Sequence, residues 1–274
     1  MRAGAEREVH TAAGPQTVEA WARRLLAAGS PAAALSVGGP PAATGADVRD
    51  EDPGRPARIG PDLGPRTKRS FRRSSLAHPR GRAELLARFA HHELQAAELM
   101  AWACLRFGRS PRPFRLGLAR IAGEELEHAA LLRARVVELG FDPEEFVQRD
   151  WFWERVPTVT TPGAFCAVMG LGLEAANLEH AELWAARLES AGDPQSAALQ
   201  RRIGAEEVAH VRFGRVWFER FEGPLAFEAW RQRLPAPLTP SVFRGRRLAR
   251  EARKDAGLTD EFIDLLDEWP MAGA

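Results

Sequence analysis

The stretches EELEH, residues 124–128, and EEVAH, residues 206–210, each place a histidine three positions after a glutamate. Positions i and i+3 share one face of an α-helix, so the glutamate and the histidine of each stretch can reach the same metal ion. Two such motifs on two helices, joined by one glutamate from each of two other helices, form the ligand set of two-metal carboxylate centres in four-helix bundles. The ligands that these stretches supply are Glu125, His128, Glu207 and His210.

Two further segments with a helical pattern supply the remaining carboxylates. Among their glutamates, residues 82–107 and 162–190 each include one pair five positions apart, which is Glu93 and Glu98 in the first segment and Glu174 and Glu179 in the second. Five residues correspond to a rise of about 7.5 Å and a rotation of about 140° along a helix, so only one glutamate of each segment can face the metals. Helical spacing alone leaves both choices open.

Glycine and proline divide the middle of the chain into two helical hairpins. The predicted helices are residues 82–107, 113–139, 162–190 and 195–221, with turns at 108–111 and 192–194. Two residues at the same height on an antiparallel hairpin have the turn midway between them. The midpoint of Glu93 and Glu125 is Arg109, in the first turn. The midpoint of Glu174 and Glu207 lies beside the second turn, so both pairs of carboxylates are predicted to be level.

The two hairpins form an internal repeat joined by a long crossover. The spacing along the chain from Glu93 to Glu174 matches the spacing from His128 to His210 to within a single position. A helix of about 28 residues is about 42 Å long, whereas about twenty extended residues reach about 66 Å. The crossover can therefore run the length of a four-helix bundle.

The sequence predicts an all-α fold in three parts. Residues 1–80 contain a helix at 15–29, followed from residue 30 to about 65 by an irregular arm rich in Pro, Gly and Ala. The apolar face of that helix consists of Val18, Trp21, Leu25 and Leu26. Residues 81–222 form the bundle, and residues 223–274 form a helical extension in which Thr259 caps a short helix.

Composition excludes several classes of protein. The net charge of +1 gives no overall attraction to nucleic acid. Two cysteines, Cys104 and Cys166, are too few for an iron–sulfur cluster, and the absence of tyrosine excludes a stored tyrosyl radical. No apolar run approaches the roughly 20 residues of a membrane span, and the first ten residues lack the apolar core of a signal peptide. We therefore expect a cytoplasmic protein without a membrane partner.

Four carboxylates and two imidazoles suit iron or manganese. We expect two iron ions, with manganese as the alternative. A centre of this kind can react with dioxygen, which predicts an oxidoreductase that acts on a small-molecule or RNA-borne substrate and receives electrons from a separate donor protein. An iron-storage or ferroxidase protein and a helical scaffold with a structural metal site are the alternatives. The oligomeric state stays open.

Two groups of charged residues have two interpretations each. Glu124 and Glu206 either face solvent or orient a histidine as outer carboxylates. The basic residues of 66–73 and 244–254 are predicted to be solvated, with RNA binding as the alternative.

Five stretches carry a resemblance to known proteins: HHELQAAELMAW (91–102), RDWFWERVPT (149–158), VMGLGLEAANLEHA (168–181), EEVAHVRFG (206–214) and FRGRRLAREARKDAGL (243–258). Over residues 82–222 the chain resembles the ferritin-like superfamily, and in particular a bacterial ferritin-like family of unknown function. The resemblance implies a ferritin-like four-helix bundle with a two-metal site, and it does not imply a substrate.

The segment ELQAA at 93–97 and the stretch at 124–128 also resemble, more distantly, the ligand motifs of the tRNA-modifying non-haem di-iron hydroxylases. The first motif of that family has the form Glu-Gln-x-Ala-Ala, and here the glutamine lies one place later. This resemblance implies that Glu93, and not Glu98, is a ligand. Through the internal repeat it also implies Glu174 in place of Glu179.

Overall fold

The structure is a computed structural model that describes residues 16–46, 48–58, 76–146 and 148–271. The described residues form helices, turns and loops and contain no β-strand. The predicted all-α class is therefore confirmed. Among these residues, no helix combines the length and the apolar character needed to cross a membrane.

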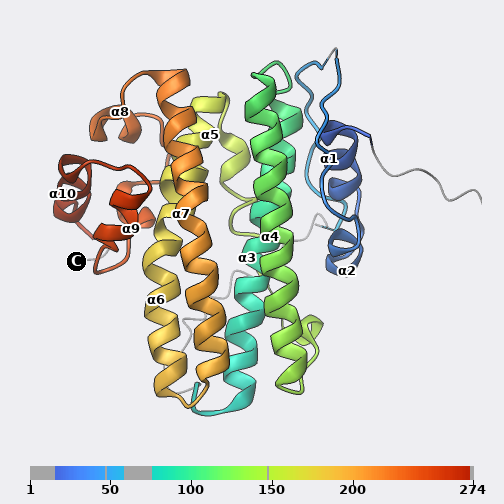
Figure 1. Cartoon of the computed structure of the whole chain (residues 1–274), viewed down its shortest axis with the longest axis vertical. Coiled ribbons are helices and arrows are strands. Elements are labelled where there is room, and N and C mark those ends of the chain that lie inside the picture. Colours follow the sequence, from blue (N-terminus) through green and yellow to red (C-terminus); the bar gives the residue numbers. More distant parts are fainter. Residues whose placement is uncertain (1–15, 47, 59–75, 147, 272–274) are drawn as a thin grey trace, which may run out of the picture.

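Long helical segments stand side by side and form the body of the molecule (Figure 1). They are α3 (Pro79–Arg106), α4 (Arg112–Glu138), α7 (Pro194–Glu222) and a continuous segment made of α5 (Pro162–Val168), η4 (Met169–Glu174) and α6 (Ala175–Ser190). Helix α3 packs along α4, α6 packs along α7, and α4 contacts α7 between the two pairs. The predicted helix ends lie close to these bounds.

Local sequence explains where these helices begin and end. Proline occupies the first turn of α3, α4, α5 and α7, where a missing N–H costs nothing. Gly192 has a φ of +79°, which a tight turn between α6 and α7 requires. The Asp193 side chain then accepts a hydrogen bond from the backbone N–H of Ser196 and caps α7.

The segment 162–190 is not the uninterrupted α-helix that the sequence predicted, because η4 is a π-helix. At Gly170 the backbone of η4 lies against Gly214 of α7, and a Cβ on Gly170 would lie 2.5 Å from the Cα of Gly214. The two glycines thus allow a close backbone contact that side chains would prevent. Short π segments inside α-helices often occur at functional sites, and this one ends at Glu174, a predicted ligand.

The two helices of the N-terminal part, α1 and α2, cover the outer side of the α3–α4 pair (Figure 1). Helix α1 (Val18–Leu26) buries the apolar face that the sequence predicted and contacts both α3 and α4. Helix α2 (Pro31–Leu35) lies in the arm that was predicted to be irregular. Its start is a local signal that the prediction missed: the Ser30 side chain accepts a hydrogen bond from the N–H of Ala33, and proline follows at the first position.

The C-terminal part lies on the opposite side, against α6 and α7 (Figure 1). It consists of α8 (Phe227–Arg231), the 3₁₀ turn η5 (Pro240–Phe243), α9 (Arg250–Asp255) and α10 (Asp260–Glu268). Thr259 caps α10 as predicted, because its side chain accepts a hydrogen bond from the N–H of Phe262. The crossover from α4 to α5 contains two 3₁₀ turns, η2 (Pro143–Glu145) and η3 (Val156–Thr158).

Candidate metal centre

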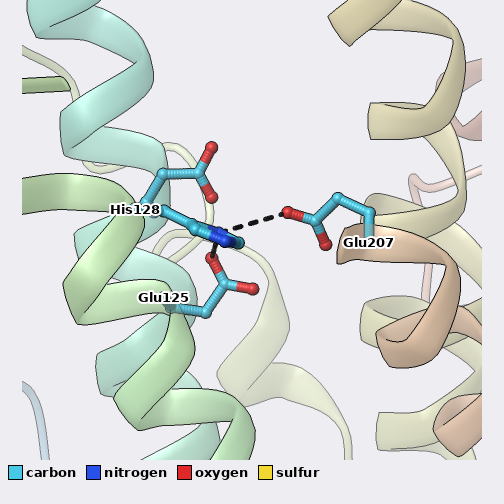
Figure 2. Close-up of side chains that lie close together, drawn as sticks. Glu125, His128 and Glu207 are labelled. Atoms are coloured by element: carbon cyan, nitrogen blue, oxygen red, sulfur yellow. Dashed lines mark ion pairs between the residues drawn. The ribbon is translucent and has the colours of Figure 1, made fainter. Parts of the chain in front are cut away.

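Four helical segments bring all six predicted ligand residues into one buried cluster. The cluster consists of Glu93 from α3, Glu125 and His128 from α4, Glu174 from η4, and Glu207 and His210 from α7. None of these residues is more than 6% exposed. Figure 2 shows Glu125 and His128 of α4 directed toward Glu207 of α7.

The cluster contains two overlapping groups of metal-compatible atoms. The His128 group consists of Glu93, Glu125, His128 and Glu207, and the His210 group consists of Glu125, Glu174, Glu207 and His210. Within each group, one ligand atom per residue lies within 4.8 Å of the others. Glu125 and Glu207 belong to both groups. The cluster has the donor atoms to bind metal.

The two histidines direct the same ring nitrogen toward the shared carboxylates. The Nδ1 atom of His128 lies 3.6 Å from Glu125 Oε2 and 3.6 Å from Glu207 Oε1. The Nδ1 atom of His210 lies 2.8 Å from Glu125 Oε1 and 2.8 Å from Glu207 Oε2. Spacing of i and i+3 on α4 and on α7 produces this arrangement, as the sequence predicted.

Several buried polar atoms of the cluster make no hydrogen bond. They are both carboxylate oxygens of Glu125, Oε1 of Glu174 and Nδ1 of His128. A buried polar atom without a partner costs about 1–3 kcal/mol, and more if it is charged. A bound cation removes this cost for all four atoms, since each is a Lewis base in its deprotonated form. The donor set therefore fits metal ions.

Charge leads to the same conclusion. Burial and the adjacent charge of Glu125 raise the pKa of Glu93 well above its ordinary value. Burial and the charges of Glu125 and Glu207 do the same to the pKa of Glu174. Burial disfavours the imidazolium form of His128, but the Glu125 and Glu207 carboxylates outweigh this effect and raise its pKa to about 9. Without cations, the cluster holds protons that bound metal would replace.

Glu124 and Glu206 contact the outer nitrogens of the histidines, and they do so across the two helices. Glu206 of α7 lies 2.8 Å from Nε2 of His128 on α4, and Glu124 of α4 lies 2.9 Å from Nε2 of His210 on α7. Both glutamate side chains are still about two-fifths exposed, at 44% and 38%. Of the two interpretations left open by the sequence, the orienting role is the one that the geometry favours. Nothing in the sequence indicated that the pairs cross.

Glu98, the alternative to Glu93, lies outside the cluster in a buried ion pair with Arg58. Nε of Arg58 lies 2.5 Å from one carboxylate oxygen of Glu98, and Trp153 Nε1 donates to the other at 3.0 Å. Arg58 also contacts Asp150 of the crossover at 3.1 Å. The N-terminal arm is thus fixed to α3 and to the crossover by one guanidinium group.

Glu179, the alternative to Glu174, has an equivalent partner in the C-terminal part. Nε of Arg253 lies 2.7 Å from Glu179, and the backbone N–H groups of Gly245 and Ala249 donate to the same carboxylate at 3.2 and 3.0 Å. The predicted solvation of basic residues 244–254 is wrong for Arg253 and Arg244, which are 0% and 6% exposed. The basic residues 66–73 lie outside the described residues.

One neighbour of the cluster was missed by the sequence analysis. The Nδ2 atom of Asn177, on α6, donates a hydrogen bond to Oε1 of Glu207 at 3.2 Å. Asn177 lies three positions after Glu174 and hence on the same helical face, so the i+3 rule that identified the histidines could have identified it.

Comparison with known proteins places the chain in a family. An uncharacterized protein of Haemophilus influenzae (strain ATCC 51907 / DSM 11121 / KW20 / Rd) is 26% identical over 226 residues, which cover 79% of this chain and 76% of that protein. No solved structure matches the chain. A family described as "Protein of unknown function (DUF455)" matches residues 11–264. Because this match spans most of the 274 residues, the chain belongs to the DUF455 family.

Proposed function

We propose that this protein is a ferritin-like four-helix-bundle oxidoreductase that holds two iron ions and uses them to oxidise a small organic substrate with dioxygen. The observation that carries the proposal is the pair of overlapping groups in one buried cluster, with Glu125 and Glu207 in both. A Glu-x-x-His motif on two helices and a single glutamate on the other two is the ligand pattern of carboxylate-bridged two-metal bundles.

The arrangement of the helices supports the ferritin-like assignment. Helices α3 and α4 form one pair and α6 and α7 form the other, each joined by a short turn. The pairs are connected along the chain by the long segment between α4 and α5, of which the structure describes residues 139–146 and 148–161. Two hairpins with one long crossover is the connection found in ferritin-like bundles.

The donor atoms favour iron, with manganese as the alternative. All six are carboxylate oxygens or imidazole nitrogens, and neither Cys104 nor Cys166 lies in the cluster. Hard oxygen ligands with imidazole suit these metals better than zinc, whose sites are usually four-coordinate and contain fewer carboxylates. Two divalent ions also balance the four carboxylate charges with both histidines neutral.

When bound, two iron(II) ions supply the electrons that dioxygen requires. The chain's own residues would hold and orient the ions and keep water out. Glu125 and Glu207, which belong to both groups, would hold both ions, and Glu93 and Glu174 would each hold one. Glu124 and Glu206 fix the outer nitrogens of the imidazoles. The chain has neither a cysteine cluster nor a tyrosine, so a separate donor protein would return electrons to the centre.

Two observations favour an enzyme that acts on a small molecule over a storage protein and over an enzyme that acts on RNA. The N-terminal and C-terminal parts cover opposite sides of the helical body, where neighbours in a storage shell would pack (Figure 1). Arg244 and Arg253, part of the basic stretch that suggested RNA, are buried and form internal ion pairs with Asp267 and Glu179.

The test combines metal analysis with oxygen kinetics. Protein purified without chelators is expected to contain about two iron or manganese ions per chain by elemental analysis. The reduced, iron-loaded protein is then mixed with oxygenated buffer in a stopped-flow spectrometer. A fast absorbance change that a bound substrate alters supports the oxidoreductase. Growth of a ferric mineral supports storage, and zero metal or a single zinc ion contradicts the two-iron centre.

A further inference from the structure

We propose that Asn177 is a positioning residue that makes the two halves of the centre unequal, so that the His128 group binds its metal ion before the His210 group. The inference rests on the two-metal centre proposed above. It concerns the order in which the centre fills, which the ligand pattern alone does not determine.

The hydrogen bond from Asn177 is the first source of inequality. Its Nδ2 donates to Oε1 of Glu207 at 3.2 Å, whereas both oxygens of Glu125 accept no hydrogen bond. Asn177 is the only asparagine in the chain, and the equivalent position in the first hairpin, three places after Glu93, is Ala96, which carries no donor. Of the two shared carboxylates, only Glu207 therefore accepts a hydrogen bond from a side-chain amide, whereas Glu125 contacts only the histidines and glutamates of the cluster among the described residues.

The held oxygen is the one nearer to His128. Oε1 of Glu207 lies 3.6 Å from His128 Nδ1, whereas Oε2 of Glu207 lies 2.8 Å from His210 Nδ1. Two ligand atoms that each lie about 2.1 Å from one ion are about 3.0–3.6 Å apart at ordinary bond angles. In the His128 group, the distance between His128 Nδ1 and Glu207 Oε1 thus already suits two ligands of one metal ion. In the His210 group, His210 Nδ1 and Glu207 Oε2 are in direct contact and leave no room for an ion between them.

The hydrogen bonds of the two histidines lead to the same order. Nδ1 of His128 has no hydrogen-bond partner, so an ion can approach it without displacing one. Nδ1 of His210 forms a hydrogen bond with Glu207 that must break before an ion binds there. Without the Asn177 side chain, Oε1 of Glu207 is free to turn away from His128. The His128 group then no longer binds its ion more tightly than the His210 group does.

The test is a titration of the metal-free protein with Mn²⁺, followed by calorimetry and by electron paramagnetic resonance. In the unmodified chain we expect two binding steps, and a half-loaded sample should show the six-line spectrum of an isolated ion. Asn177→Ala should weaken the first step about 10- to 100-fold, as loss of a residue that orients a ligand usually does. The two steps then converge, and the six-line signal of the half-loaded sample decreases.

Two further variants keep the test decisive. Asn177→Leu keeps the size of the side chain but removes the hydrogen-bond donor. It should weaken the first binding step as Asn177→Ala does, and it keeps the test valid if alanine at this position harms folding. Gln195→Ala removes an exposed amide that donates to Glu138 at 2.9 Å, far from the cluster, and should leave both steps unchanged. Unmodified protein that binds two ions, together with Asn177 variants whose first step is unchanged, would overturn this inference alone. Unmodified protein that binds no Mn²⁺ or Fe²⁺ would overturn the two-metal function as well.

Discussion

Glu206 contacts the histidine of the opposite helix, and this crossed pairing predicts which metal position depends on it. Glu206→Gln should weaken the ion bound by the His128 group about 10- to 100-fold, because a glutamine orients the imidazole less firmly than a carboxylate does. The same substitution should add little in a His128→Ala background and act fully in a His210→Ala background. Metal titration of the single and double variants checks this. Glu127→Gln, an exposed change in the stretch 124–128, is the control.

Glu93 and Glu98 lie on the same helix and are predicted to have different roles. Glu93→Gln should lower the bound metal to about one ion per chain with the helices intact. Glu98→Gln should leave the metal content unchanged and lower the free energy of unfolding by about 3–5 kcal/mol, since Arg58 then stays buried with Asp150 as its one acidic partner. Elemental analysis and urea unfolding separate the two effects. Loss of metal in the Glu98 variant would reverse the ligand assignment.

At the residue scale, spacing along helices predicted most of the cluster. The histidines and Glu125 and Glu207 follow from the i+3 rule, because both members of each pair belong to one helix. The crossed contacts of Glu124 and Glu206 could not be predicted, since they depend on how far α4 and α7 approach each other. The partner of Glu98 could not be predicted either, because Arg58 lies 40 positions away in an arm without a periodic pattern.

At the scale of elements, the contact between Gly170 and Gly214 supports the π segment that ends at Glu174. Gly214→Ala would bring a Cβ to 2.6 Å from the Cα of Gly170, so η4 and α7 must separate. We expect a loss of about 1–3 kcal/mol in unfolding free energy and weaker metal binding at the His210 group, which contains Glu174. Thermal unfolding and metal titration measure these effects. Gly29→Ala, in open space at an exposed position, should change neither.

Helix ends were predictable because glycine and proline act locally, whereas the π segment was not. Pro162, Gly192 and Pro194 restrict their own backbone and that of their neighbours. The wider π-helical turn of η4 depends on a different helix, α7, because Gly214 of α7 lies against Gly170 of η4. Nothing in the sequence near 169–174 identifies that partner, so periodicity favoured a regular α-helix.

At the scale of the whole molecule, the charge of the cluster predicts how stability changes with pH. The pKa values of Glu93, Glu174, His128 and His210 are all raised in the metal-free fold, His128 to about 9. The folded state then binds more protons than the unfolded chain, so its stability falls as pH rises toward 9.

The measurement is thermal unfolding of the metal-free and the Mn²⁺-loaded protein between pH 6 and pH 9. The metal-free midpoint should fall by on the order of 5 °C over this range. The midpoint of the loaded protein should fall less, because ions bind the deprotonated ligands and their affinity grows with pH. A metal-free protein that becomes more stable from pH 6 to pH 9 contradicts the proposed protonation of the cluster.

Arg58 and Arg253 join the N-terminal and C-terminal parts to the helical body at equivalent positions of the internal repeat, on Glu98 and Glu179. Arg253 is 0% exposed, so Arg253→Met leaves the Glu179 carboxylate buried without its counter-ion. Breaking one half of such a pair costs about 3–5 kcal/mol. The double variant Arg253→Met with Glu179→Gln should recover much of this loss, because no unpaired charge stays buried. Urea unfolding of the single and double variants measures both changes.

The same ion pairs predict that the arm, the helical body and the extension unfold together. Denaturant unfolding followed by circular dichroism and by tryptophan fluorescence should give one coincident transition, since Trp153 and Trp230 report on the crossover and the extension. Arg250→Met is the matched control, because Arg250 is 37% exposed and its pairing with Asp264 lies at the surface, where water and salt screen it. Two separate transitions, or equal losses in the Arg250 and Arg253 variants, would show that the extension is a separate unit whose contacts do not stabilise the bundle.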